Sequence, residues 1–478
     1  MGHTNQREEH DMVASHGSIV THEDPIIEKN SLLETISGEV LLPGQPGFDE
    51  SRSIWNGMID RSPALIVRPA NAQDVATAIA FAREHELSIA IKSGGHNVAG
   101  YAVNDDGLMI DMSLMRGVSV DRLARTVTVQ GGATWEDVDQ ATGAFGLATT
   151  GGAISTTGVA GLTLGGGVGW LAGNFGMAID NLLEVELVTA DGAVICANET
   201  EHADLFWALR GGGGNFGVVT SLRFNLHPLD QVLAGMIAFP AERSRDVLEF
   251  YREFLTDKPD ELSVYCSLMA EPEHGFRIVG MAICWSGDLD EGWRVLSALD
   301  RLGEPLVKQI GPMPYADWQK ANNPLFPHKR RYYWKGALVT DLDDKLLDIV
   351  ADAGASPELP WANVTIESYG GALNRIASDA TAFPHREARF QVLAIGAWDD
   401  ASDDERGVAW ARDLHERVAP FGLQGSFLNF VTEDGDSRSN RLKLGYGANW
   451  SRLAAVKQRY DPENRFRANN NIVPGTAD

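Results

Sequence analysis

The chain has 478 residues, of which 44% are hydrophobic and 22% charged, and this globular composition is long enough for two or three domains and excludes disorder as the main state. Its 66 acidic residues outnumber its 40 basic residues and give a formal net charge of −26, without a cluster of Lys or Arg that could follow a phosphate backbone. We therefore expect no nucleic-acid partner, and the acidic surface indicates either adaptation to high salt or ordinary colloidal repulsion.

Three widely spaced cysteines, Cys196, Cys266 and Cys284, form no CxxC pair. They predict neither a disulfide framework nor a structural zinc site. The first 30 residues lack the apolar core of a signal peptide, and nowhere are 18 consecutive residues apolar. These features predict a cytoplasmic protein without a metal ion and without a membrane partner.

The N-terminal part of the chain predicts an arm followed by a β-α-β unit. Residues 1–36 have no apolar periodicity and predict a mobile arm. An apolar run at 64–67, a helix-start signal at Asn71 and a second apolar run at 87–91 then predict strand, helix and strand. Because the second strand leads directly into a glycine pair and His96, these residues are expected at the edge of a sheet.

The next part of the chain predicts more strands around a glycine-dense passage. The strands are predicted at residues 107–111, 126–130, 183–189 and 216–224. Residues 149–169 are rich in glycine and carry no charge. Such a passage suits a backbone pressed against a ligand better than it suits a surface linker.

After Pro228 the pattern changes to that of a second, antiparallel α+β domain. A helix-like stretch covers residues 241–254. Strands are predicted at residues 262–269, 277–285, 335–340, 363–368 and 390–398.

Several common catalytic and nucleotide-binding motifs are absent or misplaced. Gly212, Gly214 and Gly217 have the spacing of a dinucleotide-binding loop, but they follow a helix-like stretch and precede a strand, the reverse of the order that this motif requires. The chain also lacks the P-loop, nucleophile-elbow and HExxH patterns. Phosphoryl transfer, serine hydrolysis and zinc hydrolysis are therefore not predicted.

Two glycine-rich loops, at residues 93–97 and 149–169, can form a nest of backbone N–H groups for an anionic cofactor without positive side chains. His96 directly follows Gly94 and Gly95, so its imidazole can face a ligand held by the same loop. The residues by themselves leave a cofactor role and a structural role for His96 equally open.

Four motifs occur in the order and spacing of a known flavoprotein family: KSGGHNVAGY at 92–101, GVAGLTLGGGVG at 158–169, Asp180 with Asn181, and RGGGGNFG at 210–217. A matching closing segment follows at residues 446–474. With these motifs the chain resembles the berberine bridge enzyme-like oxidases of the vanillyl-alcohol-oxidase/PCMH flavoprotein superfamily. The resemblance extends from about residue 37 to the end of the chain.

The resemblance implies an α+β fold with two domains. A PCMH-type FAD-binding domain of two α/β subdomains is implied for residues 37–228, and an antiparallel-sheet α+β substrate domain for residues 229–439. Residues 440–478 would complete the FAD-binding domain.

The resemblance also implies FAD as the cofactor. His96 matches the histidine that bonds covalently to the 8α-methyl group of the flavin. Ile154 stands where many relatives carry a second linking cysteine, so a single covalent link is implied. The other implied cofactor-binding residues are Lys92, Ser93, Gly94, Gly95, Asn97, Gly100, Gly152, Thr157, Gly158, Gly161, Asn181, Gly217, Val219, Asn469 and Asn471.

The catalytic base that the family often uses is missing. That base is a tyrosine in a Tyr-x-Asn-Tyr motif, whereas residues 427–430 read Phe-Leu-Asn-Phe and offer no ionisable group. Our first candidate is Glu367, which matches an active-site glutamate strand of one relative and shares a strand face with Thr365 and Tyr369. The alternative for Glu367 is a structural hydrogen-bonded pair. The further candidates are Tyr369, Tyr333 with its neighbour Tyr332, and Tyr446.

The implied activity is the oxidation of a small alcohol, amine or natural-product substrate by hydride transfer to flavin N5, with O2 reduced to H2O2. A dehydrogenase or oxidative cyclase of the same fold with poor O2 reactivity is the alternative, and a non-redox scaffold is a remote third. The sequence leaves the oligomeric state open.

Overall fold

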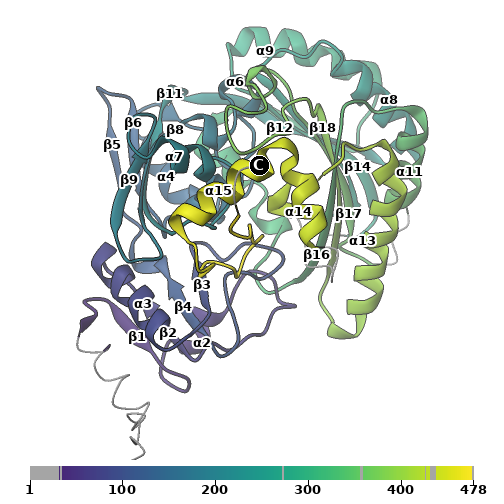
Figure 1. Ribbon diagram of the computed structural model, residues 1–478. Helices are drawn as coiled ribbons and strands as arrows, with labels where there is room; N and C mark the ends of the chain where they lie inside the picture. The colour runs from purple at the N-terminus through teal and green to yellow at the C-terminus, as the bar shows by residue number, and fades with distance from the viewer. Residues whose placement is uncertain are drawn as a thin grey trace, which may run out of the picture.

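The computed structural model describes residue 32 and residues 35–271, 274–355, 359–425, 427–430 and 438–475. The predicted arm, residues 1–36, lies almost wholly outside this part of the chain. The described residues form two halves, seen at the left and right of Figure 1, with the last helices in the middle of the view.

The first sheet delivers His96 to the interior. Its strand order is β1-β2-β4-β3, in which β2, β4 and β3 are parallel. The strands are β1 (Glu39–Leu41), β2 (Leu65–Arg68), β3 (Ile89–Lys92) and β4 (Leu108–Asp111). Helix α3 (Ala72–Glu84) joins β2 to β3, and Oδ1 of Asn71 caps it by accepting a hydrogen bond from N–H of Asp74 at 3.0 Å. The predicted β-α-β unit is confirmed, and His96 lies in the loop after β3.

The second sheet is antiparallel, in the order β5-β6-β10-β8-β9. Its strands are β5 (Val118–Asp121), β6 (Thr126–Gln130), β8 (Leu182–Val188), β9 (Val194–Asn198) and β10 (Val218–Asn225). Their apolar side chains share a core with α4 (Trp135–Gly143), α5 (Val159–Leu164) and α7 (Ala203–Leu209). Gly212, Gly214 and Gly217 lie in the loop that joins α7 to β10. The prediction that they follow a helix and precede a strand is confirmed.

The other half is built on a seven-stranded antiparallel sheet in the order β15-β12-β14-β13-β17-β18-β16 (Figure 1). The strands are β12 (Gln231–Pro240), β13 (Leu262–Ala270), β14 (Arg277–Trp285), β15 (Val307–Pro314), β16 (Arg331–Val339), β17 (Asn363–Ser368) and β18 (Phe390–Trp398). Helices α8 (Ser244–Phe254), α9 (Leu289–Leu296), α11 (Asp344–Ala355) and α13 (Asp404–Val418) contribute to the hydrophobic core on one face. The predicted antiparallel α+β second half is confirmed.

The other face of this sheet is turned toward the first half of the chain. In β17, Val364 and Ile366 belong to the core under the helices, whereas Asn363, Thr365 and Glu367 line a cavity. This alternation follows from the two-residue period of a strand. It decides which side chains of the sheet can meet a ligand.

The C-terminal segment returns to the first half. Its helices are α14 (Arg438–Tyr446) and α15 (Trp450–Tyr460), drawn in yellow in Figure 1. Nζ of the fully buried Lys457 donates to the carbonyls of Asn215 and Phe466, at 2.7 and 2.9 Å, and to Oδ2 of Asp461 at 2.6 Å. These bonds tie the tail to the glycine loop at 211–217.

Across the described part of the chain, no helix combines the length and apolarity needed to span a membrane. In the same residues, no group of three or more His, Cys, Asp or Glu is arranged to hold a metal ion. The three cysteines are free thiols, and Cys266 and Cys284 are buried.

Candidate active site

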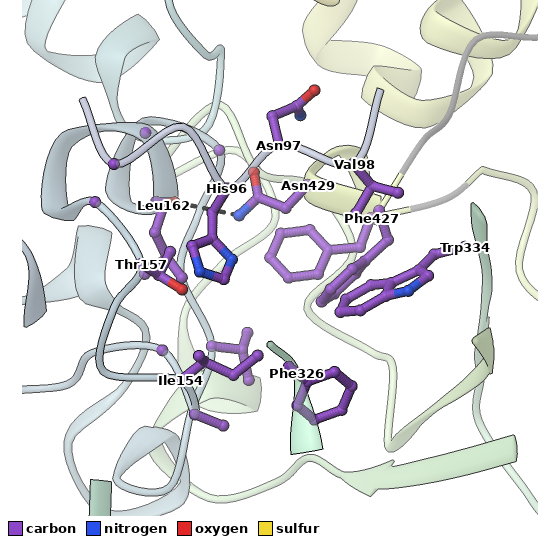
Figure 2. Close-up of a pocket in the computed structure, with 18 of the residues that line it drawn as sticks. His96, Asn97, Val98, Ile154, Thr157, Leu162, Phe326, Trp334, Phe427 and Asn429 are labelled. Carbon is purple, nitrogen blue, oxygen red and sulfur yellow. Dashed lines mark hydrogen bonds between the residues drawn. The ribbon is translucent and has the colours of Figure 1, made fainter. Parts of the chain in front are cut away.

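A cavity of about 950 Å³ lies between the glycine loops of the first half and the seven-stranded sheet. Its wall includes the loops around Gly94, Gly158 and Gly214, together with side chains from the sheet. Figure 2 shows His96 on one side of this space and the ring of Trp334 on the other. The two halves of the chain thus build one site.

Glycine is required where the loops meet. A Cβ atom placed on Gly94 would lie 2.3 Å from the backbone N of Gly158, and one placed on Gly158 would lie 2.2 Å from that of Gly94. Any side chain at these positions would force the loops apart. A Cβ on Gly161 or Gly214 would meet no atom within 4 Å, although both residues line the cavity. The loops therefore present bare backbone to a ligand.

His96 lies in the cavity wall as a neutral imidazole. Its Nε2 is 2.9 Å from Oγ1 of Thr156, and its ring stacks on Trp55 with centroids 4.7 Å apart. Burial, and then the neighbouring His328, lower the pKa of His96 to about 3. Nδ1 has no hydrogen-bond partner among the described residues, so it carries a lone pair when Nε2 donates to Thr156. This nitrogen is available to a ligand.

Most of the residues predicted to bind the cofactor line the cavity. They are Ser93, Gly94, Gly95, His96, Asn97, Gly152, Thr157, Gly158, Gly161, Gly217, Val219 and Asn469. The four that do not line it are Lys92, Gly100, Asn181 and Asn471.

These four residues lie close to the site but make other contacts. Nζ of Lys92 donates to the carbonyl of Ser51 at 2.6 Å, and the amide of Asn181 donates to two backbone carbonyls at 3.0 and 2.9 Å. Gly100 has a φ of 76°, a conformation that favours glycine. Oδ1 of Asn471 is buried without a hydrogen-bond partner in the described residues. Lys92, Gly100 and Asn471 each adjoin a lining residue in the sequence, whereas Asn181 does not.

Glu367 is the only carboxyl group among the described residues that line the cavity. Burial raises its pKa to about 7, while a hydrogen bond from Tyr369 acts in the opposite direction. Near neutral pH, Glu367 is therefore close to its midpoint and can either hold or release a proton.

Tyr369 and Gln391 form a hydrogen-bonded chain with Glu367. Oη of Tyr369 lies 3.1 Å from Oε2 of Glu367 and also contacts Oε1 of Gln391. A phenol has one proton, so Tyr369 cannot donate to both oxygens. When Tyr369 donates to Gln391, Glu367 must be protonated and donate to Tyr369. When Glu367 is ionised, it accepts the hydrogen bond from Oη of Tyr369, and the Gln391 amide turns so that its NH2 group donates to Tyr369.

Tyr332 and Tyr333 do not reach the cavity. The strand predicted at 335–340 already begins at Arg331, so both tyrosines belong to β16 and point to opposite faces. Oη of Tyr333 accepts a hydrogen bond from Nε of Arg412 in α13 at 3.1 Å. The ring of Tyr332 stacks on Trp55 at 3.9 Å. Both rings are committed to packing.

Tyr446 lines the cavity, and its buried Oη has no hydrogen-bond partner in the described part of the chain. Burial raises the pKa of Tyr446, so it stays a phenol. Phe427 and Phe430, at the positions of the missing Tyr-x-Asn-Tyr motif, line the cavity without a hydroxyl group. Nδ2 of Asn429 donates to the carbonyl of Leu162 at 3.2 Å, as Figure 2 shows.

The sequence did not single out Tyr265 or Gln391. Tyr265 lies opposite Glu367 in the register of β13 and β17, and Gln391 lies opposite Glu367 on β18. Tyr265 lines the cavity and stacks on Trp170 with ring centroids 4.2 Å apart. Alternation in the predicted strand at 262–269 could have placed Tyr265 on one face, but only the strand register shows that it meets Glu367.

The cavity fits a dinucleotide cofactor such as FAD. Gly161 and Gly214 leave room that a side chain would fill, and Arg330, before β16, is the one basic side chain among the described lining residues. A diphosphate against these loops would therefore be bound by backbone N–H groups. His96 stands in the same wall with a free nitrogen.

Comparisons with known proteins agree with this fit. Residues 63–198 match the FAD binding domain family, and residues 426–473 match the family described as berberine and berberine like. The chain is 32% identical to an FAD-linked oxidoreductase of Dictyostelium discoideum, over 93% of this chain and 96% of that protein. It is also 32% identical to (R)-6-hydroxynicotine oxidase of Paenarthrobacter nicotinovorans, over 92% and 97%.

A solved structure shows the same architecture. The crystal structure of 6-hydroxy-D-nicotine oxidase from Arthrobacter nicotinovorans is similar with a TM-score of 0.84 at 32% identity, covering 92% of this chain and 98% of that one. The PCMH-type FAD-binding fold with an antiparallel-sheet substrate half, inferred from the sequence, is confirmed.

Proposed function

The chain belongs to the berberine bridge enzyme-like family of FAD-linked oxidoreductases, and we propose that it oxidises a small alcohol, amine or natural-product substrate and reduces O2 to H2O2. The substrate loses a hydride and a proton, and O2 gains two electrons and two protons. The observation that carries the proposal is that His96 and Glu367 line one cavity.

The cofactor is FAD, and we propose that one covalent link, from Nδ1 of His96, holds it. Bound FAD would accept the hydride at N5 and return the electrons to O2. The neutral imidazole with an unpartnered Nδ1 supports the link. Ile154 lines the cavity where a second linking cysteine would stand, and none of the three cysteines, all of which are described, lines it. A single link follows.

Glu367 is the proposed proton acceptor. The ionised carboxylate of Glu367 accepts a hydrogen bond from Oη of Tyr369, and this bond stabilises the deprotonated form that can accept a proton. Gln391 orients Tyr369. The apolar rings of Phe427 and Trp334 restrict water and fit a flat substrate. An amine suits this site well because its neutral form needs no strong base to lose a hydride, which compensates for the missing tyrosine.

The cofactor proposal is tested by acid precipitation of the purified protein, with its mass and visible spectrum. We expect a yellow pellet and one FAD of added mass. In His96→Ala the colour should move to the supernatant, whereas His328→Ala, which changes a neighbouring ring, should keep it in the pellet. Flavin in the supernatant of the unmodified protein would overturn the covalent link.

The activity is tested by screening amines and alcohols for substrate-dependent H2O2 release. Peroxide in amounts matching the product formed would support an oxidase. If the substrate reduces an artificial electron acceptor but no peroxide forms, the protein is a dehydrogenase or an oxidative cyclase and not an oxidase. A colourless protein that cannot be reconstituted with FAD would replace it by a non-redox scaffold.

A further inference from the structure

Arg330 is a lone cation in the wall of the proposed substrate cavity. No other Lys or Arg is among the described lining residues, and the one carboxyl group there is Glu367. In a protein with a net charge of −26, an anion meets few favourable partners. The position of this guanidinium therefore bears on which substrates the cavity accepts.

Arg330 lies at the end of the sheet away from Glu367. It directly precedes β16, Trp361 precedes β17 and Asp399 follows β18, and these three strands are neighbours in the sheet. Glu367 is the fifth residue of β17 (Asn363–Ser368), about 13 Å of extended strand from the end of β17 that follows Trp361. The cavity face thus carries an acid and a guanidinium at separate ends.

Asp399 and Trp361 hold the guanidinium in place. Nε of Arg330 donates to Oδ1 of Asp399 at 2.9 Å, and Nε1 of Trp361 donates to Oδ2 of the same carboxylate at 2.6 Å. Cζ of Arg330 lies 4.3 Å from the centroid of the Trp361 ring. The backbone carbonyl of Arg330 accepts a hydrogen bond from N–H of Gly57 at 2.8 Å. Both the side chain and its loop are therefore preorganised.

The two terminal nitrogens of this guanidinium remain open. In the described part of the chain, neither Nη1 nor Nη2 of Arg330 makes a hydrogen bond, although the side chain is only 15% exposed. A guanidinium presents these N–H groups as a planar fork that matches a carboxylate. Because Arg330 lines the cavity, the fork is available to a ligand bound there.

Three aromatic rings line the same cavity as Arg330. The ring of Trp334 lies 5.8 Å from that of Phe326 and 5.9 Å from that of Phe430, and all three residues line the cavity. A ligand that reaches Arg330 would therefore place an apolar, flat body against these rings. Asp399 already compensates part of the positive charge of the guanidinium. A ligand group with one negative charge therefore matches the remaining charge better than a dianion does.

We propose that Arg330 binds the carboxylate of the substrate, so that the enzyme acts on aromatic or similarly flat compounds that carry an acid group. The proposal rests on the proposed function in one respect, namely that this cavity holds the substrate. It adds the chemical class of that substrate and the residue that selects it.

Isothermal titration calorimetry of the holoenzyme tests this selection without turnover. The probes are 3-indolepropionate, its neutral amide and phenyl phosphate. We expect the carboxylate to bind about tenfold or more tightly than the amide, as a charge-assisted pair implies. Arg330→Gln should remove this preference and leave the affinity for the amide unchanged. Lys329→Gln, which removes an exposed neighbouring charge outside the cavity wall, should keep it.

Unchanged circular dichroism and flavin absorption spectra would show that Arg330→Gln is folded. Equal affinity for carboxylate and amide, or no carboxylate binding, would overturn the proposal, and so would a preference that survives Arg330→Gln. Tighter binding of phenyl phosphate would replace the carboxylate by a phosphate ester. Absence of peroxide with every substrate would sink the oxidase proposal alone, because the binding measurement does not depend on turnover.

Discussion

Burial raises the pKa of two carboxyl groups, Glu367 and Asp139, to about 7. Only Glu367 lines the cavity; Asp139 in α4 accepts a hydrogen bond from Nε2 of Gln319 at 3.1 Å, where the two halves meet. Each pKa in the folded protein lies above its ordinary value, so both carboxyl groups bind a proton more strongly in the folded state than in the unfolded state. The stability that the protonated groups contribute is present at low pH and is lost as the pH rises toward 7.

Infrared difference spectra between about pH 5 and about pH 9 should resolve these two protons, because protonated carboxyl groups have a separate carbonyl stretch. We expect this band to disappear with a midpoint near pH 7. Glu367→Gln should remove one part of it and Asp139→Asn the other. Tyr369→Phe should move the Glu367 midpoint upward, since the lost hydrogen bond lowers that pKa.

Thr365→Val is the matched control, because Thr365 lies on the same face of β17 but bonds to Ser267 and Asn363. It should leave the Glu367 midpoint in place. A band that is unchanged in Glu367→Gln would contradict a raised pKa at this site. If Glu367 accepts the substrate proton, kcat/KM for an alcohol substrate should rise with pH up to the same midpoint and then level off.

At the scale of elements, apolar runs and alternation located several strands to the residue. The predicted strands at 126–130, 277–285, 363–368 and 390–398 coincide with β6, β14, β17 and β18. Strands β12 and β15 were not predicted. Burial on both faces does not account for β12, because β18 is buried at every position and was predicted. Strand β15 carries Gly311, Pro312 and Pro314, which resemble a turn. Proline is tolerated in β15 because it is an edge strand.

The same limit applies to the candidate site. The resemblance to a known family located His96, Gly94 and Gly158 through the order and spacing of whole motifs, although Gly94 and Gly158 meet across two loops that are far apart in the sequence. The contacts of Glu367 with Gln391 and Tyr265 depend on strand register, which the local sequence does not contain. Strand β16 begins at Arg331 rather than at the predicted residue 335, and Oη of Tyr333 bonds to Arg412 instead of reaching the cavity.

We expect the attachment of the C-terminal segment to the first half of the chain to depend strongly on Lys457. Lys457→Met leaves Asp461 buried without its cation, and removal of one partner from such a pair costs about 3–5 kcal/mol. Urea unfolding should show this loss in the free energy of unfolding. The purified variant should also carry less FAD per chain, because Lys457 holds the carbonyl of Asn215 in the glycine loop where the cofactor has to bind before it is linked.

Arg459→Met, on the same helix, tests whether the effect belongs to burial. Its ion pair with Asp204 at 2.9 Å is exposed, and such pairs contribute about 0–1 kcal/mol. An equal loss of stability in both variants would show that α15 responds to any change. The proposed role of Lys457 requires the larger loss to be confined to Lys457→Met.

At the scale of the whole molecule, the net charge of −26 acts on the folded state as self-repulsion. Salt shortens the distance over which these charges interact, from about 10 Å at 0.1 M to about 3 Å at 1 M. The Lys457–Asp461 pair in the C-terminal segment is fully buried and is screened far less. The Arg330–Asp399 pair is screened more, because Asp399 is exposed. Salt should therefore stabilise the protein overall without weakening the contact that holds the C-terminal segment.

We expect the melting temperature of the holoenzyme to rise by about 2–4 °C between 0.1 M and 1 M NaCl and then to level off, because screening is nearly complete at that concentration. Preferential exclusion of a solute from the surface also stabilises proteins, but it grows steadily with concentration and does not require charge. Sucrose at matched osmolality separates the two causes. A rise that continues in proportion to salt and is reproduced by sucrose would assign the effect to exclusion, and a melting temperature that falls with NaCl would show that attractive surface pairs outweigh the repulsion.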